Sequence, residues 1–177
     1  MIKDIKVLSR LQVQLLGLES NSYDTLSFPF PFPYKRWCLI SIHEGIPLLD
    51  DRIKRALKSI GCCDFLSLNF WDIKAEHFEN LKKEYSDCVL FDRSHARDII
   101  EFIDRLNKDK MPSALIIHCH AGISRSGAVA TFACDYLNLD YQTFLSDNHE
   151  IRANQYILGV LHDVVNTKAR HNGITIS

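Results

Sequence analysis

The chain has almost no net charge and lacks any long apolar segment. Its 21 lysine and arginine residues nearly balance 22 aspartate and glutamate residues, which leaves a formal net charge of −1. Such a balance provides no excess of positive charge to attract nucleic acid or an anionic membrane surface. No apolar run approaches the roughly 20 residues that a membrane-spanning helix requires. We therefore expect a protein without a nucleic-acid partner and without membrane attachment.

Targeting signals and disulfide patterns are also missing. Residues 1–6 lack the apolar stretch and the small-residue cleavage site of a signal peptide. The six cysteines show no spacing typical of a disulfide framework, which suits a reducing compartment. No second Cys-x2-Cys or histidine pair completes a zinc shell around His118-Cys119-His120. We therefore expect a cytoplasmic protein with no bound metal and no cofactor.

The length and the hydrophobic pattern indicate one α/β domain over residues 1–177. A chain of 177 residues with 46% hydrophobic content can bury one good core. Continuous apolar strands alternate with amphipathic helices, which favours a central, mostly parallel sheet of four to five strands with helices on both faces. We expect strands at 5–9, 37–42, 65–70 and 114–117, and helices at 10–18, 51–60, 75–85, 94–106, 128–137, 141–149 and 154–168. The expected caps are Asp50 or Asp51 for the second helix and Ser94 for the fourth.

The segment 118–127 contains the candidate reactive residues. Cys119 and Arg125 flank five residues, between an apolar strand and a helix. A glycine-bearing loop in that position turns its backbone N–H groups inward as an anion nest, and the helix N-terminus adds positive potential. A thiol there should ionise well below its ordinary pKa of about 8.5. Because Arg125 can grip two oxygens of one phosphate, the segment predicts phosphoryl transfer to a thiolate.

The stretch 118–126 reads His-Cys-His-Ala-Gly-Ile-Ser-Arg-Ser and resembles the Cys-x5-Arg loop of the cysteine-dependent protein tyrosine phosphatases. The resemblance is strongest to the dual-specificity branch. It implies a protein tyrosine phosphatase-like fold, with a catalytic core at 37–170 and metal-free hydrolysis through a phosphocysteine intermediate. Residues 1–36, read as a strand, a helix and a loop, have no clear counterpart.

Roles follow from the matching positions. Cys119 matches the nucleophile, Arg125 the phosphate clamp, and Ser126 the hydroxyl that hydrogen-bonds the thiolate and helps it leave. His118 matches a histidine that supports the loop from behind, a role compatible with an ordinary buried histidine. Asn154 matches a residue that supports the loop and positions water; the family's preceding proline is missing here, and an ordinary helix N-cap is the alternative. The phosphate-binding positions are His120, Ala121, Gly122, Ile123, Ser124 and Arg125.

The leaving oxygen of the substrate needs a proton, which a carboxylic acid can supply. The resemblance places this acid on a loop after an earlier strand, where Asp72 follows Trp71. Asp72 lies 47 positions before Cys119, farther than in compact members of the family, so residues 74–91 are interpreted as an insertion. Asp92 and Asp87 lie nearer in sequence and remain alternatives.

The expected substrate is a phosphorylated protein or peptide that carries phosphotyrosine, and also phosphoserine or phosphothreonine. We expect the enzyme to be a monomer. The alternatives are a phosphatase of a non-protein ester (a phosphoinositide, an inositol phosphate or an RNA 5′ end), an inactive phosphate-binding module, and another thiol enzyme. Phosphoinositide-type loops tend to carry lysines between the cysteine and the arginine, and residues 120–124 include none. The intact Cys119, Arg125 and Ser126 disfavour the inactive module.

The proline-rich run 28–34 places proline at every second position, which excludes a helix or a central strand. We interpret it as a surface loop. A partner-binding segment and a wall of the substrate cleft are the alternatives.

Overall fold

The computed structural model describes residues 1–19 and 35–171, so the proline-rich run 28–34 lies outside the described residues. The elements are β1 (Ile2–Ser9), α1 (Arg10–Glu19), β2 (Trp37–His43), α2 (Asp51–Ser59), β3 (Cys62–Asn69), α3 (Ala75–Glu84), α4 (Arg93–Lys108), β4 (Ser113–Cys119), α5 (Arg125–Tyr136), α6 (Tyr141–Asp147) and α7 (Gln155–His171). They occupy the segments that the hydrophobic pattern predicts, with ends that differ by a few residues.

The four described strands form one parallel sheet in the order β1-β4-β2-β3. The two central strands, β2 and β4, are buried along nearly their whole length, because helices cover both faces of the sheet. The expected α/β class with a mainly parallel sheet is therefore confirmed. The carboxyl ends of all four strands meet at one edge, where open α/β sheets bind their ligands.

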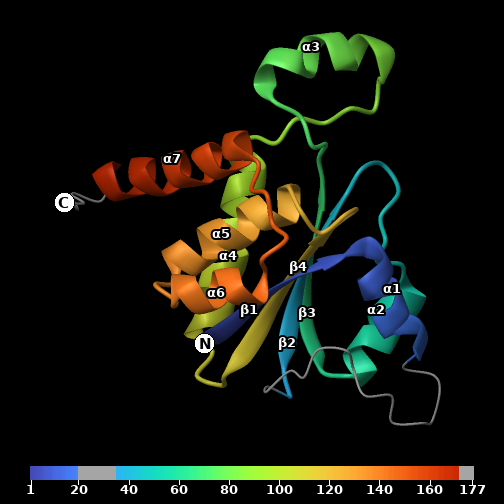
Figure 1. Ribbon diagram of the computed structural model, residues 1–177, viewed down its shortest axis with the longest axis vertical. Coiled ribbons are helices and arrows are strands. Elements are labelled where there is room, and N and C mark those ends of the chain that lie inside the picture. The colour runs from blue at the N-terminus through green and yellow to red at the C-terminus, as the bar shows by residue number, and fades with distance from the viewer. Residues whose placement is uncertain (20–34, 172–177) are drawn as a thin grey trace.

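Two apolar cores lie on the two faces of the sheet. Helices α4, α5, α6 and α7 cover one face, and α1 and α2 cover the other (Figure 1). Helix α3 stands apart from both layers, and none of its side chains is buried (Figure 1). Within the described ranges, no helix combines the length and the hydropathy that a bilayer crossing requires.

The first 19 residues belong to the same sheet and core as the rest of the domain. Strand β1 pairs with β4 along its length, in a register that sets Ser9 against Cys119. Val13 and Leu16 of α1 are buried in the core beneath the sheet. The N-terminal segment, which had no clear counterpart in the family resemblance, thus lies beside the strand that leads into the Cys119 loop.

The cap of helix α4 differs from the expectation. The helix begins at Arg93, and its N-cap is Asp92 rather than Ser94. The Asp92 carboxylate accepts hydrogen bonds from the backbone N–H groups of Ser94 (2.9 Å) and His95 (3.2 Å). The Ser94 hydroxyl also donates to this carboxylate, over 2.6 Å. The prediction for Ser94 was wrong because the Asp92 carboxylate caps the N–H groups of Ser94 and His95, so the helix begins before Ser94. At α2, Asp50 is the cap.

Candidate active site

The loop 119–125 leaves the carboxyl end of β4 and enters α5. Gly122 in this loop has a φ of +75°, a left-handed conformation that favours glycine. A Cβ atom at Gly122 would lie 2.7 Å from the carbonyl carbon of Leu8 and 2.7 Å from the nitrogen of Ser9. The Arg10 N–H also donates to the His120 carbonyl over 3.0 Å. The end of β1 therefore supports the loop at contact distance and leaves no room for a side chain.

A second segment holds the loop from the other side. The Arg152 N–H donates to the Ile123 carbonyl (3.0 Å), and the Asn154 N–H donates to the Ser124 carbonyl (3.2 Å). These bonds occupy outer carbonyls of the loop. The loop is thus fixed between β1 and the segment that precedes α7, which keeps its shape independent of a ligand.

Cys119 lies at the base of this loop and is only 2% exposed. Its Sγ lies 3.1 Å from the Ser126 hydroxyl oxygen. Burial by itself would raise the pKa of this thiol. Hydrogen bonds from the Ser126 side chain and backbone and from the Ile123 backbone, together with the Arg125 charge, outweigh burial and lower the pKa below its ordinary value. The site therefore favours a thiolate.

Arg125 is 4% exposed and is held by residues that directly follow the strands β2 and β3. Its Nη1 donates to the Phe70 carbonyl over 3.0 Å and pairs with Glu44 Oε1 at 2.8 Å. Its Nε has no hydrogen-bond partner in the part of the chain that the structure describes. Sequence reasoning did not identify Glu44. The one available signal was its place directly after strand β2, whose carboxyl end adjoins that of β4.

His118 lies behind the loop, as the resemblance implied. Its Nε2 is 2.8 Å from the Ser41 hydroxyl, and its Nδ1 is 3.3 Å from the Cys119 carbonyl oxygen. Burial lowers the pKa of His118 to about 4, so the imidazole is neutral at physiological pH. His118 contacts the backbone of Cys119 and links it to strand β2.

Asp72 lies at the rim of the loop. Its Oδ1 accepts hydrogen bonds from the Ser124 hydroxyl and from Asn154 Nδ2, both over 2.8 Å. The Oδ1 of Asn154 accepts the backbone N–H groups of Tyr156 (3.0 Å) and Ile157 (3.2 Å) at the start of α7. Asn154 therefore caps a helix and also contacts the proposed acid, so the two interpretations of this residue are compatible.

The two alternative aspartates occupy other places. Asp92 caps α4; burial would raise its pKa, but hydrogen bonds from Ser94 and His95 lower it to about 2. These hydrogen bonds stabilise the charged carboxylate and hold it at the start of α4. The Asp87 carboxylate lies beside Gly45, 3.7 Å from where a Cβ on that glycine would be. Of the three candidates, Asp72 is the one hydrogen-bonded to the loop.

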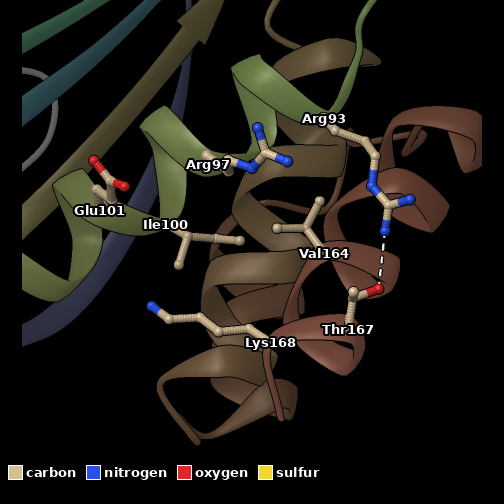
Figure 2. Close-up of a pocket in the computed structure, with 7 residues that line it drawn as sticks. All are labelled: Arg93, Arg97, Ile100, Glu101, Val164, Thr167 and Lys168. Atoms are coloured by element: carbon tan, nitrogen blue, oxygen red, sulfur yellow. Dashed lines mark hydrogen bonds between the residues drawn. The ribbon is translucent and has the colours of Figure 1, made fainter. Parts of the chain in front are cut away.

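Cavities occur in two regions of the surface, one beside the Cys119 loop and one between α4 and α7. Beside the loop, a cavity of about 170 Å³ adjoins Arg125, and another of about 730 Å³ runs past Asp72 and Asn154. A hollow of about 430 Å³ lies elsewhere, between α4 and α7, where Arg93 Nη2 donates to the Thr167 hydroxyl over 2.9 Å (Figure 2). That hollow contains none of the residues predicted for catalysis. Among the described residues, no three His, Cys, Asp or Glu side chains gather as a metal site.

Comparison with known proteins gives one family match and several similar solved structures. The protein-tyrosine phosphatase family model matches residues 90–151, a range that includes the whole loop. Similar solved structures include PTPMT1 in complex with PI(5)P (13% identity, TM-score 0.48, 95% of this chain and 94% of that chain) and PTPMT1 (13%, 0.45, 96% and 95%). Another is the human tyrosine phosphatase-like serine/threonine/tyrosine-interacting protein (16%, 0.34, 78% and 80%). No curated protein matches the sequence.

The resemblance to protein-tyrosine phosphatases rests on residues 90–151, the segment that the family model matches.

Proposed function

We propose that the protein hydrolyses phosphotyrosine, and also phosphoserine and phosphothreonine, in protein substrates. The observation that carries this proposal is the attachment of Asp72 to the Cys119 loop through Ser124, over 2.8 Å. It brings a carboxyl group to the rim of a loop that holds a thiol with a lowered pKa. A protein substrate is favoured because no lysine lies between Cys119 and Arg125 to meet further phosphates of a phosphoinositide.

In the first step, the Cys119 thiolate attacks phosphorus while Arg125 and the backbone N–H groups of the loop hold the phosphate oxygens. The bond from phosphorus to the substrate oxygen breaks, and that oxygen takes a proton from Asp72. The Oδ1 of Asp72 already accepts two hydrogen bonds, from Ser124 and Asn154. Within the described residues Oδ2 accepts none, so it is the oxygen that we assign to the proton.

In the second step, water attacks the phosphocysteine, the bond from sulfur to phosphorus breaks, and inorganic phosphate leaves. The water proton passes to the Asp72 carboxylate, which restores the acid. Ser126 assists because its hydroxyl, 3.1 Å from Sγ, can donate to the thiolate as it departs. Asn154 acts as a positioning residue through its hydrogen bond to Asp72.

Hydrolysis of matched substrates tests the proposal. Phosphotyrosine, phosphoserine and phosphothreonine peptides, a phosphoinositide and an RNA 5′-triphosphate are supplied to the same preparation, with Cys119→Ser as the blank. We expect the phosphotyrosine peptide to show the highest kcat/KM. A higher kcat/KM for the phosphoinositide or the RNA would overturn the protein substrate and leave the phosphocysteine chemistry intact. Failure to trap a phosphoenzyme at Cys119 would overturn the chemistry.

We also propose a cytoplasmic location. It is supported by the six cysteines, all of which lie in the described residues as free thiols. Fractionation of cells that express the full chain tests it, and recovery with secreted or membrane material would contradict it.

A further inference from the structure

Helices α4 and α7 border a hollow of about 430 Å³ that the proposed reaction does not use. Sites for small ligands usually measure about 300–1,000 Å³, so this hollow has room for several side chains of a bound segment. Each helix contributes one of its faces to the lining. The residues are Arg93, Arg97, Ile100 and Glu101 of α4, and Val164, Thr167 and Lys168 of α7.

The floor of the hollow is apolar. Ile100 is 3% exposed and Val164 is 8% exposed, and both belong to the core that α4 and α7 share. Figure 2 shows the two side chains turned toward each other between the helices. An apolar side chain that enters the hollow would pack on this floor and leave water, which favours binding.

Two arginines at the hollow lack an acidic partner. Arg93 Nη2 donates to the Thr167 hydroxyl over 2.9 Å, and this neutral group leaves the charge of the guanidinium unbalanced (Figure 2). The guanidinium of Arg97 makes no hydrogen bond and no ion pair with any residue that the structure describes. A guanidinium presents a planar set of N–H donors that matches a carboxylate.

The other charges of the lining do not cancel these two arginines. Lys168 lies 3.8 Å from Asp104, in a surface ion pair that contributes little. Within the described part of the lining, Glu101 is the one carboxylate, and it lies at the opposite end of the hollow from Arg93 (Figure 2). The hollow therefore has an excess of positive charge, and the ligand that complements it is anionic.

We infer that this hollow binds an acidic segment of a partner protein, with an apolar side chain among its carboxylates. The apolar side chain packs on Ile100 and Val164, and the carboxylates accept hydrogen bonds from Arg93 and Arg97. These two arginines lie four residues apart on α4 and so on the same face of the helix, where they can bind neighbouring carboxylates. Binding here does not require hydrolysis at Cys119, so the inference does not depend on the proposed function.

Titration of the isotope-labelled protein with pools of random octapeptides tests the inference by nuclear magnetic resonance. The first pool contains aspartate, glutamate and leucine. In the second pool asparagine and glutamine replace the acids, and in the third pool serine replaces leucine. We expect the first pool to shift the backbone amide signals of α4 and α7. Each replacement should weaken the apparent affinity about tenfold, because it removes the carboxylates or the apolar side chain.

A double variant locates the binding. Arg93→Gln/Arg97→Gln should weaken the affinity for the first pool about tenfold, because the carboxylates lose their donors. Both arginines are exposed, so the variant should keep the amide spectrum of a folded protein. The matched control is Arg52→Gln/Arg55→Gln, which removes two exposed arginines from α2 and should leave the affinity unchanged.

The remaining outcomes would overturn the inference. They are the absence of shifts in α4 and α7 with the first pool, equal shifts with the second pool, or an equal loss of affinity in the control variant. Equal shifts with inorganic phosphate alone would show a site for any small anion. Sedimentation with phosphatidylserine vesicles that the Arg93→Gln/Arg97→Gln variant loses, without binding of any peptide pool, would assign the hollow to a lipid surface. The comparison of pools uses wild type and so does not depend on the folding of a variant.

Discussion

Asn154 Nδ2 donates a hydrogen bond to Asp72 Oδ1 over 2.8 Å and so connects two segments that lie 82 positions apart. Asn154 is itself held in place, because its backbone N–H donates to the Ser124 carbonyl of the phosphate-binding loop. Asn154 thus links the proposed acid and the first turn of α7 through its side chain, and the loop through its backbone. This connection fixes the Asp72 carboxylate relative to the loop that holds the Cys119 thiol.

Cys119→Ser should abolish turnover and leave phosphate binding largely intact. The backbone cradle and Arg125 remain, whereas a serine hydroxyl does not ionise where the Cys119 thiol does. Steady-state kinetics and calorimetric titration with vanadate measure the two effects. Turnover near the wild-type rate would contradict the assignment of the nucleophile.

Asp72→Asn should lower kcat by roughly 10²- to 10⁴-fold, the usual contribution of a general acid. An asparagine keeps the hydrogen-bonding shape near Ser124 and Asn154 but has no proton of that acidity to give. The loss should grow as the leaving group becomes poorer, because an activated phenol departs with little help. A series of aryl phosphates measures this. Asp87→Asn serves as the control, and a leaving-group-dependent loss in that variant would place the acid at Asp87.

Asp92→Ala should destabilise the protein by about 1 kcal/mol, because α4 loses its N-cap. The dependence of kcat on the leaving group should stay as in wild type, since Asp92 carries a structural role. Denaturant titration and the same aryl phosphates give the two readouts. A free energy of unfolding equal to that of wild type, together with a leaving-group-dependent loss of kcat, would contradict the structural role of Asp92.

Stability should fall as the pH drops from about 6.5 to about 4. Burial lowers the pKa of His118 to about 4 in the folded protein, so the unfolded chain binds a proton there at a higher pH than the folded one. The contribution of the neutral imidazole is therefore complete above pH 6.5 and is lost as the pH falls through this window. It amounts to about 3 kcal/mol. Denaturant titrations across pH 4–7.5 measure it, and His118→Gln, which cannot gain the charge, should show a flatter profile.

Gly122→Ala should reduce activity and destabilise the protein by about 1–3 kcal/mol. The φ of +75° disfavours an L side chain, and the new methyl would meet the backbone of Leu8 at 2.7 Å. The matched control is Gly159→Ala, in α7, where a Cβ meets nothing within 4 Å. That change should stabilise the protein by about 0.5–1 kcal/mol. Equal effects of the two substitutions would rule out the close contact between loop and β1.

Local features of this protein could be predicted from sequence because they depend on consecutive residues. The strand, the loop with Gly122 and the helix follow one another within residues 113–136, so backbone geometry alone makes a nest around Cys119. The capping signals at Asp50 and Gly61 likewise bound α2 as expected. The error at Ser94 has a local cause too, since two capping side chains stood within one helical turn and the carboxylate prevailed.

The partners of the loop were decided by the tertiary structure. Glu44 reaches Arg125 and Ser41 reaches His118 only because β2 lies next to β4. Arg10 reaches the loop only because β1 pairs with β4 on its other side. The order of the strands depends on which helices pack on each apolar face of the sheet. The hydrophobic pattern within a single segment carries no information on that order. The sequence by itself therefore determined the loop around Cys119, and the packing of the sheet determined which distant charged residues surround it.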